Sequence, residues 1–74
     1  MIKNDVGMNA GKVYRLLCKK GKLSLREIGE STHSSELTIY LAIGWLLREN
    51  KINITEQNEK LFFELNDSLS EMYY

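Results

Sequence analysis

The spacing of hydrophobic residues changes once along the chain, from a helical period before residue 50 to a period of two after it. In the first part the apolar positions fall three and four residues apart, which predicts three helices at about residues 5–20, 24–31 and 35–49. Leu23 is predicted to be a very short extended segment between the first two helices. From Ile52 to Leu65 apolar and polar residues alternate, which predicts two strands.

Local signals set the expected boundaries of these elements. Residues 24–27 (Ser-Leu-Arg-Glu) fit a capping box, in which the serine hydroxyl and the glutamate carboxylate satisfy opposite backbone amides. Ser34 or Ser35 can cap the third helix, and Asn50 can take the left-handed conformation that follows it. The polar residues 57–60 lack the glycine of a tight primed turn, so we expect a four-residue loop between the strands.

The predicted order is helix, short strand, helix, turn, helix and hairpin. This is a helix-turn-helix unit followed by a wing, so the sequence predicts an α+β fold of the winged helix-turn-helix type, with three helices and a C-terminal β-hairpin. We expect one such domain over residues 1–65. Residues 66–74 contain a second capping-box match and an apolar stripe, and for this tail a short docked helix and a frayed end both stay open.

The composition excludes several kinds of chemistry. A single cysteine, Cys18, and a single histidine, His33, supply neither a disulfide pair nor a zinc ligand set. No catalytic constellation, metal motif or cofactor loop is visible, so we expect no enzyme, no cofactor and no small-molecule substrate. No apolar run approaches the roughly 18 residues that a membrane span needs. The start of the chain lacks the apolar segment of a signal peptide, so we expect no membrane and a cytoplasmic location.

The formal charge is zero, but the charges are unevenly distributed. Residues 1–22 hold six Lys and Arg against one acid, a net charge of +5, whereas residues 23–50 carry −2 and residues 51–74 carry −3. A nucleic-acid binder usually has its basic footprint on the reading face, but here the excess lies on the predicted first helix. Four of its cations could form a basic patch for phosphate, and a solvated helix face is the alternative. They are Lys12, Arg15, Lys19 and Lys22.

The predicted third helix is apolar on more than one side. Its expected inward positions are Ile39, Ala42, Ile43 and Leu46. A DNA-reading helix presents a polar or basic outer face, but this one presents Tyr40, Leu41 and Trp45. Three interpretations stay open: these side chains pack within the chain, they contact another chain, or the helix reads DNA. The candidate nucleic-acid contacts are Ser34, Ser35, Thr38, Arg48, Lys12 and Lys19.

The aromatic residues outside the expected core favour contact with protein, because Tyr and Trp are common interface anchors. On the first helix, Tyr14 shares a stripe with Gly7 and Gly11, and on the second strand of the hairpin Phe62 points away from its apolar neighbours. We therefore predict an interaction surface, with a homodimer as the expected assembly. Its residues are Tyr14, Tyr40, Leu41, Trp45 and Phe62.

Two stretches of the chain resemble a known family. Residues 6–14 (Val-Gly-Met-Asn-Ala-Gly-Lys-Val-Tyr) and 42–52 (Ala-Ile-Gly-Trp-Leu-Leu-Arg-Glu-Asn-Lys-Ile) are similar to small stand-alone bacterial winged helix-turn-helix proteins. The resemblance covers about residues 4–65 and implies the fold, and it implies DNA association only by analogy with that fold. The expected function is a non-enzymatic regulatory or interaction module whose surface favours protein contact. The alternative is a sequence-specific DNA-binding transcriptional regulator.

Overall fold

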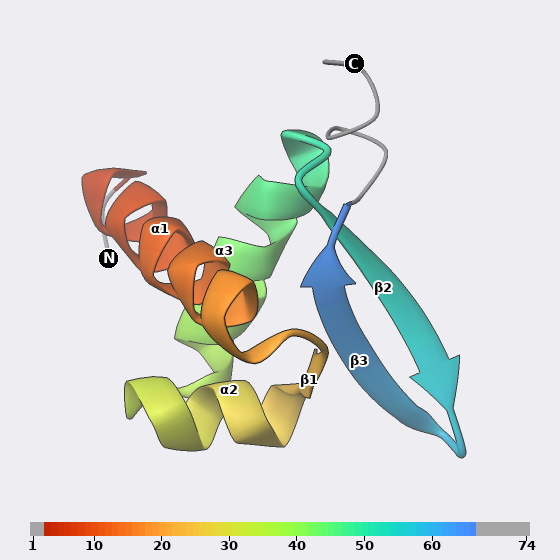
Figure 1. Ribbon diagram of the computed structural model, residues 1–74. Coiled ribbons are helices and arrows are strands. Elements are labelled where there is room, and N and C mark those ends of the chain that lie inside the picture. Colours follow the sequence, from red (N-terminus) through yellow and green to blue (C-terminus); the bar gives the residue numbers. More distant parts are fainter. Residues whose placement is uncertain (1–2, 67–74) are drawn as a thin grey trace.

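The computed structural model describes residues 3–66, which form three helices and three strands (Figure 1). The elements in chain order are α1 Lys3–Lys20, β1 Leu23–Ser24, α2 Leu25–Thr32, α3 Glu36–Arg48, β2 Ile52–Gln57 and β3 Lys60–Leu65. Each predicted helix and strand is confirmed to within about two residues. The prediction for the C-terminal tail concerns residues 66–74, and all of these except Asn66 lie outside the described part of the chain.

The strands form an antiparallel sheet in the order β1-β3-β2. β3 pairs with β2 along its whole length, from Ile52 opposite Leu65 to Gln57 opposite Lys60. At its other edge β3 pairs with the two residues of β1, where Leu23 lies opposite Phe63. The hairpin that follows α3 thus pairs with the short strand between α1 and α2. Figure 1 shows the hairpin standing beside the three helices, as a wing does.

The turn of the hairpin is shorter than the sequence predicts. Only Asn58 and Glu59 lie between the strands, because Gln57 and Lys60 still pair. Their φ angles are 52° and 65°, and two successive positive φ values are what a type I′ turn requires. Asparagine tolerates this conformation, and the twist of the paired strands imposes it on Glu59 in place of the usual glycine. The prediction of a four-residue loop is therefore wrong.

Capping hydrogen bonds fix where α2 and α3 begin. The Glu27 backbone N–H donates to Ser24 Oγ at 3.2 Å, and the Ser24 N–H donates to Glu27 Oε1 at 2.8 Å, which confirms the capping box. The Ser24 backbone amide thereby lowers the pKa of Glu27 below its usual value of 4.5. Ser35 caps α3 by accepting from the Thr38 N–H at 3.2 Å. Asn50 has a φ of 58°, as expected after this helix.

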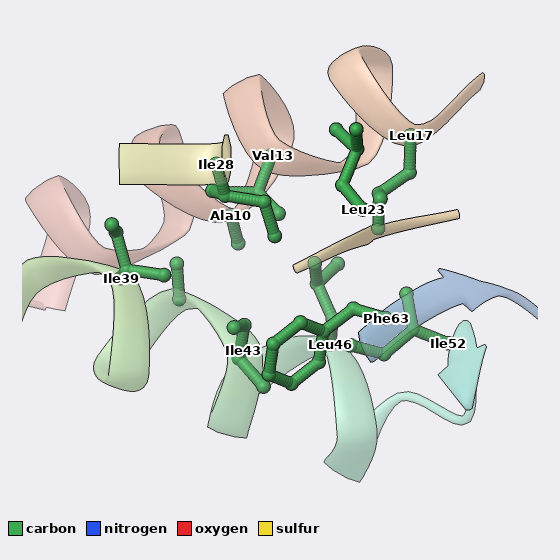
Figure 2. Close-up of a cluster of buried hydrophobic side chains, with 11 residues drawn as sticks. Ala10, Val13, Leu17, Leu23, Ile28, Ile39, Ile43, Leu46, Ile52 and Phe63 are labelled. Atoms are coloured by element: carbon green, nitrogen blue, oxygen red, sulfur yellow. The ribbon is translucent and has the colours of Figure 1, made fainter. Parts of the chain in front are cut away.

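The core is a cluster of buried hydrophobic side chains drawn from all six elements (Figure 2). Its members are Ala10, Val13, Leu17, Leu23, Ile28, Ile39, Ala42, Ile43, Leu46, Ile52 and Phe63. The four inward positions expected for α3 are all among them, each no more than 3% exposed. Because α3 turns these residues inward, its remaining side chains point away from the core, and they form the surface described next.

Candidate functional site

The outer side of α3 carries large apolar residues that the core leaves uncovered. They are Leu37, Tyr40, Leu41, Trp45 and Leu47, with exposed fractions of 67, 48, 40, 38 and 40%. Their spacing places them around the helix on the sides away from Ala42 and Leu46. We call these five residues the α3 apolar face. Exposed apolar patches of more than a few hundred Å² are unusual on a monomer and commonly mark a binding surface.

Trp45 lies at the edge of the α3 apolar face that adjoins α1. A Cβ atom built on Gly7 of α1 would lie 3.7 Å from Cζ2 of the Trp45 indole, which is ordinary van der Waals contact. One edge of the indole therefore lies beside α1 at Gly7, where an alanine would also fit. The rest of the ring contributes to the 38% of Trp45 that remains exposed. The residue is thus more covered than exposed, with α1 contributing to its cover at Gly7.

Gly44 lies within the α3 apolar face, one turn after Tyr40 and Leu41 and one turn before Leu47. Among residues 3–66, a Cβ built at this position would meet no heavy atom within 4 Å. Glycine inside a helix costs roughly 1 kcal/mol relative to alanine, and Gly44 lacks the positive φ that would favour glycine. No contact within the protomer requires a glycine at this position. What the missing side chain does allow is the close approach of another backbone to α3.

The concave surface between α3 and the wing carries more negative than positive charge. A hollow of about 740 Å³ lies between α2, the start of α3 and the hairpin turn. Its charged residues are Arg26, Glu30, Glu36, Glu59 and Lys60, and Arg26 Nε pairs with Glu30 Oε2 at 3.4 Å. With two cations against three carboxylates, this hollow repels a phosphate backbone. Neutralisation of phosphates dominates affinity for DNA, so the hollow is a poor DNA site. The apolar floor fits a hydrophobic side chain better.

The nucleic-acid candidates on α3 do not form one surface. Ser35 Oγ donates to Thr38 Oγ1 at 3.0 Å and also caps the helix, so both hydroxyls already serve the start of α3. Ser34 Oγ donates to the backbone carbonyl oxygen of Thr32 at 3.4 Å. Arg48 is exposed and lies at the other end of the helix. A duplex reading this helix would therefore meet a single cation, far from the capping hydroxyls.

The two candidates on α1 lie together in a second, shallow hollow. Lys12 and Lys19 line about 470 Å³ of open space with Arg15, Leu16, Ser31 and Thr32. The sequence pattern predicts a patch of lysines and arginine on α1. The pattern does not predict that Ser31 and Thr32 of α2 lie beside this patch, because their position depends on how α2 packs against α1.

The other two aromatic residues of the predicted interaction surface lie apart from the α3 apolar face. Tyr14 is half-buried against the core, and Lys51 Nζ lies 5.4 Å from the centre of its ring. Phe62 is half-buried on the face of β3 opposite Phe63, with Lys22 Nζ at 5.7 Å from its ring centre. Each ring therefore has a lysine over it. The other three predicted residues, Tyr40, Leu41 and Trp45, all lie on α3, with Tyr40 toward the hollow at the hairpin turn and Trp45 toward Gly7 of α1.

Cys18 and His33 stand on different elements. Cys18 is an exposed free thiol on α1, whereas His33 takes the left-handed C-cap position of α2, where its N–H donates to the Gly29 carbonyl at 2.9 Å. Over residues 3–66 no group of three histidine, cysteine or carboxylate side chains is placed to hold a metal ion. In the same range no helix is long and apolar enough to cross a membrane.

Comparison with known proteins matches both the sequence and the fold. The family model of the winged helix-turn-helix domain (DUF2582) matches residues 1–65. The uncharacterised protein MJ1608 of Methanocaldococcus jannaschii is 36% identical over 64 residues, which cover 81% of this chain and 89% of that protein. The solved structure of protein BT2368 from Bacteroides thetaiotaomicron has a TM-score of 0.84 at 34% identity and covers all of this chain and 89% of its own.

More distant solved structures share the fold alone. HlyU from Vibrio cholerae has a TM-score of 0.64 at 20% identity, covering 99% of this chain and 94% of its own. HlyU from Vibrio vulnificus, described as a transcriptional regulator, has a TM-score of 0.67 at 18% identity, covering 97% of this chain and 88% of its own.

Proposed function

The chain belongs to the winged helix-turn-helix domain family (DUF2582), and we propose that it is a non-enzymatic regulatory module that binds a second copy of itself through the α3 apolar face. One observation carries this proposal. The helix that is polar or basic in a DNA reader here exposes five large apolar side chains. The module comprises residues 1–65 with residues 66–74 as a tail, and its single exposed thiol, Cys18, suits the reducing cytoplasm.

The size of the α3 apolar face is compatible with a dimer contact. Five side chains of roughly 200 Å² each, about half exposed, contribute about 500 Å² per protomer, against about 800 Å² per partner in a standard interface. Leu61, which is 39% exposed and lines the same hollow as Tyr40, extends the surface toward the wing. Tyr40 and Trp45, on two sides of this surface, are residues of the kind that dominates interface energetics.

A second copy is the partner that best fits this surface. In a two-fold dimer the same patch meets itself, so a surface rich in charge of one sign would repel its partner. The charged residues of α3 on or beside this face are at its two ends: Arg48 lies on the side of Leu41 in the last turn, and Glu36 lies in the first turn. Gly44 lets two such helices approach closely where they cross.

Sedimentation equilibrium of matched variants tests this proposal. Leu41→Glu places a carboxylate in the α3 apolar face of both copies, and we expect it to be a monomer at concentrations where the wild type is a dimer. Met8→Glu is the control, because Met8 is 65% exposed on α1 and lies outside the face. It should remain a dimer. A monomeric wild type, or a dimer that Leu41→Glu leaves intact, would refute the proposal.

A sequence-specific DNA-binding regulator is the second candidate, and the fold shared with HlyU, described as a transcriptional regulator, favours it. In that case the start of α3 would enter the major groove, with Ser35 and Thr38 near the bases and Arg48 on a phosphate. Thr38→Ala should then relax the preference between duplex sequences, and Arg48→Ala should weaken all of them alike. Absence of duplex binding at about 50 mM salt would exclude this candidate.

A further inference from the structure

We propose that the outer face of α1 is a separate binding site for the phosphate backbone of a duplex nucleic acid. The site consists of Lys12, Arg15 and Lys19 of α1, with Ser31 at the end of α2; we call it the α1 basic face. It lies on one protomer and on a different helix from the α3 apolar face. The inference therefore does not depend on self-association.

The three cations form a line on the solvent side of α1. Their spacing of three and four residues keeps them on one face of the helix, opposite the buried Ala10 and Val13. From Lys12 to Lys19 the helix rises by about 10 Å. Three cations spaced along this length can each neutralise one phosphate, so the α1 basic face engages about three phosphates. A single small anion would engage only part of the line.

The charges of the α1 basic face are not neutralised by the protein. No acidic side chain lines the hollow, and none of the three cations forms an ion pair with another described residue. The C-terminal end of α2 brings a partial negative charge of about half a unit, which three full positive charges outweigh. The Thr32 hydroxyl donates to the Ile28 carbonyl at 2.8 Å, whereas the exposed hydroxyl of Ser31 can donate to a phosphate oxygen.

The lining favours a duplex over a single strand. Proteins that hold single strands stack the bases on aromatic side chains, and no aromatic residue of the described part of the chain lines this hollow. Elsewhere on the molecule, the hollow between α3 and the wing has more carboxylates than cations on its rim and repels a polyanion. A duplex is therefore directed to α1, while α3 stays available to protein. This reverses the docking in which the recognition helix enters the groove.

Fluorescence anisotropy with a short labelled duplex tests the inference. If about three phosphates are neutralised, the logarithm of affinity falls with the logarithm of salt concentration at a slope of about −2.7, so binding weakens about 40-fold between about 50 and 200 mM salt. The triple variant Lys12→Gln/Arg15→Gln/Lys19→Gln should lose both the binding and this slope. The side chains are exposed, and a thermal melt close to that of the wild type would show that the variant is folded.

The matched control removes the same amount of charge from α3 and the hairpin region, as Arg48→Gln/Lys51→Gln/Lys60→Gln. We expect it to keep the wild-type salt slope, and we expect monomeric Leu41→Glu to keep it too, which separates this site from the proposed dimer. The inference is overturned if the wild type binds no duplex at about 50 mM salt. It is also overturned if the control loses as much binding as the α1 variant, or if only vesicles containing phosphatidylserine are bound.

Discussion

Replacing Gly44 with alanine should change the stability of the protomer and its self-association in opposite directions. In the protomer the added Cβ has open space, with no heavy atom within 4 Å. Alanine is better than glycine inside a helix by roughly 1 kcal/mol. For a domain of this size that difference raises Tm by about 4–8 °C. We therefore expect monomeric Gly44→Ala to melt several degrees above the monomeric wild type.

In the proposed dimer the same methyl group would lie where the two α3 helices approach each other. Overfilling a packed contact costs typically about 1–3 kcal/mol. Because each 1.4 kcal/mol is a tenfold change in Kd, we expect the dimer of Gly44→Ala to dissociate at a concentration about tenfold higher or more. The gain within the protomer and the loss between protomers have separate causes, so they can be measured separately.

The assay combines urea unfolding of dilute, monomeric protein with sedimentation equilibrium at higher concentration. Gly29→Ala is the control, because its Cβ would lie 3.3 Å from Cδ1 of Ile39 inside the protomer. It should gain less stability than Gly44→Ala and leave the Kd of the dimer unchanged. A Gly44→Ala monomer that is less stable than the wild type would show that the site is not open. An unchanged Kd would show that the α3 backbones do not meet at Gly44.

Three further changes test the account of the fold. Ser24→Ala removes a helix cap and should lower the free energy of unfolding by about 1 kcal/mol. The pKa of Glu27 is lowered from 4.5 in the folded state, so the stabilising contribution of the ionised Glu27 should be complete above pH 4.5. It should fade as pH drops through the folded-state pKa, which urea titrations at a series of pH values measure. Glu59→Gly relieves a positive φ of 65° and should raise the free energy of unfolding by roughly 0.5–1 kcal/mol, and a lower Tm would contradict this reading of the turn. Phe63→Ala empties a site that is 1% exposed and should cost roughly 3–5 kcal/mol, enough to unfold much of so small a domain in circular dichroism; a wild-type melt would show that the ring is not part of the core.

The order of the elements could be predicted because each carries a local signal. The capping box at Ser24 and the apolar spacing of α3 depend only on residues within one or two helical turns, and the structure confirms both. The hairpin turn was mispredicted for the same reason. Sequence preference at Asn58 and Glu59 is weak, whereas the pairing of six residues on each side imposes a two-residue turn. Pairing across the sheet outweighs the local preference.

The candidate surfaces depend on how the helices cross, which the sequence pattern does not contain. Periodicity predicted that Tyr40, Leu41 and Trp45 lie away from the inward residues of α3. It left open whether α1 or the wing covers them, because that depends on the angle between α1 and α3. The structure shows that α1 contacts Trp45 at Gly7 and that 38% of Trp45 stays exposed. The junction of the α1 cations with Ser31 likewise arises from two helices that lie side by side only after folding.

Two copies are proposed to meet at the α3 apolar face, and the fluorescence of Trp45 reports directly on that contact. It is the only tryptophan in the chain, and it is 38% exposed in the protomer. Its fluorescence emission should therefore shift to longer wavelength on dilution, with the same midpoint as the fall in mass measured by sedimentation. A dimer that dissociates with no change in Trp45 emission would place the contact elsewhere and contradict the proposed dimer through the α3 apolar face.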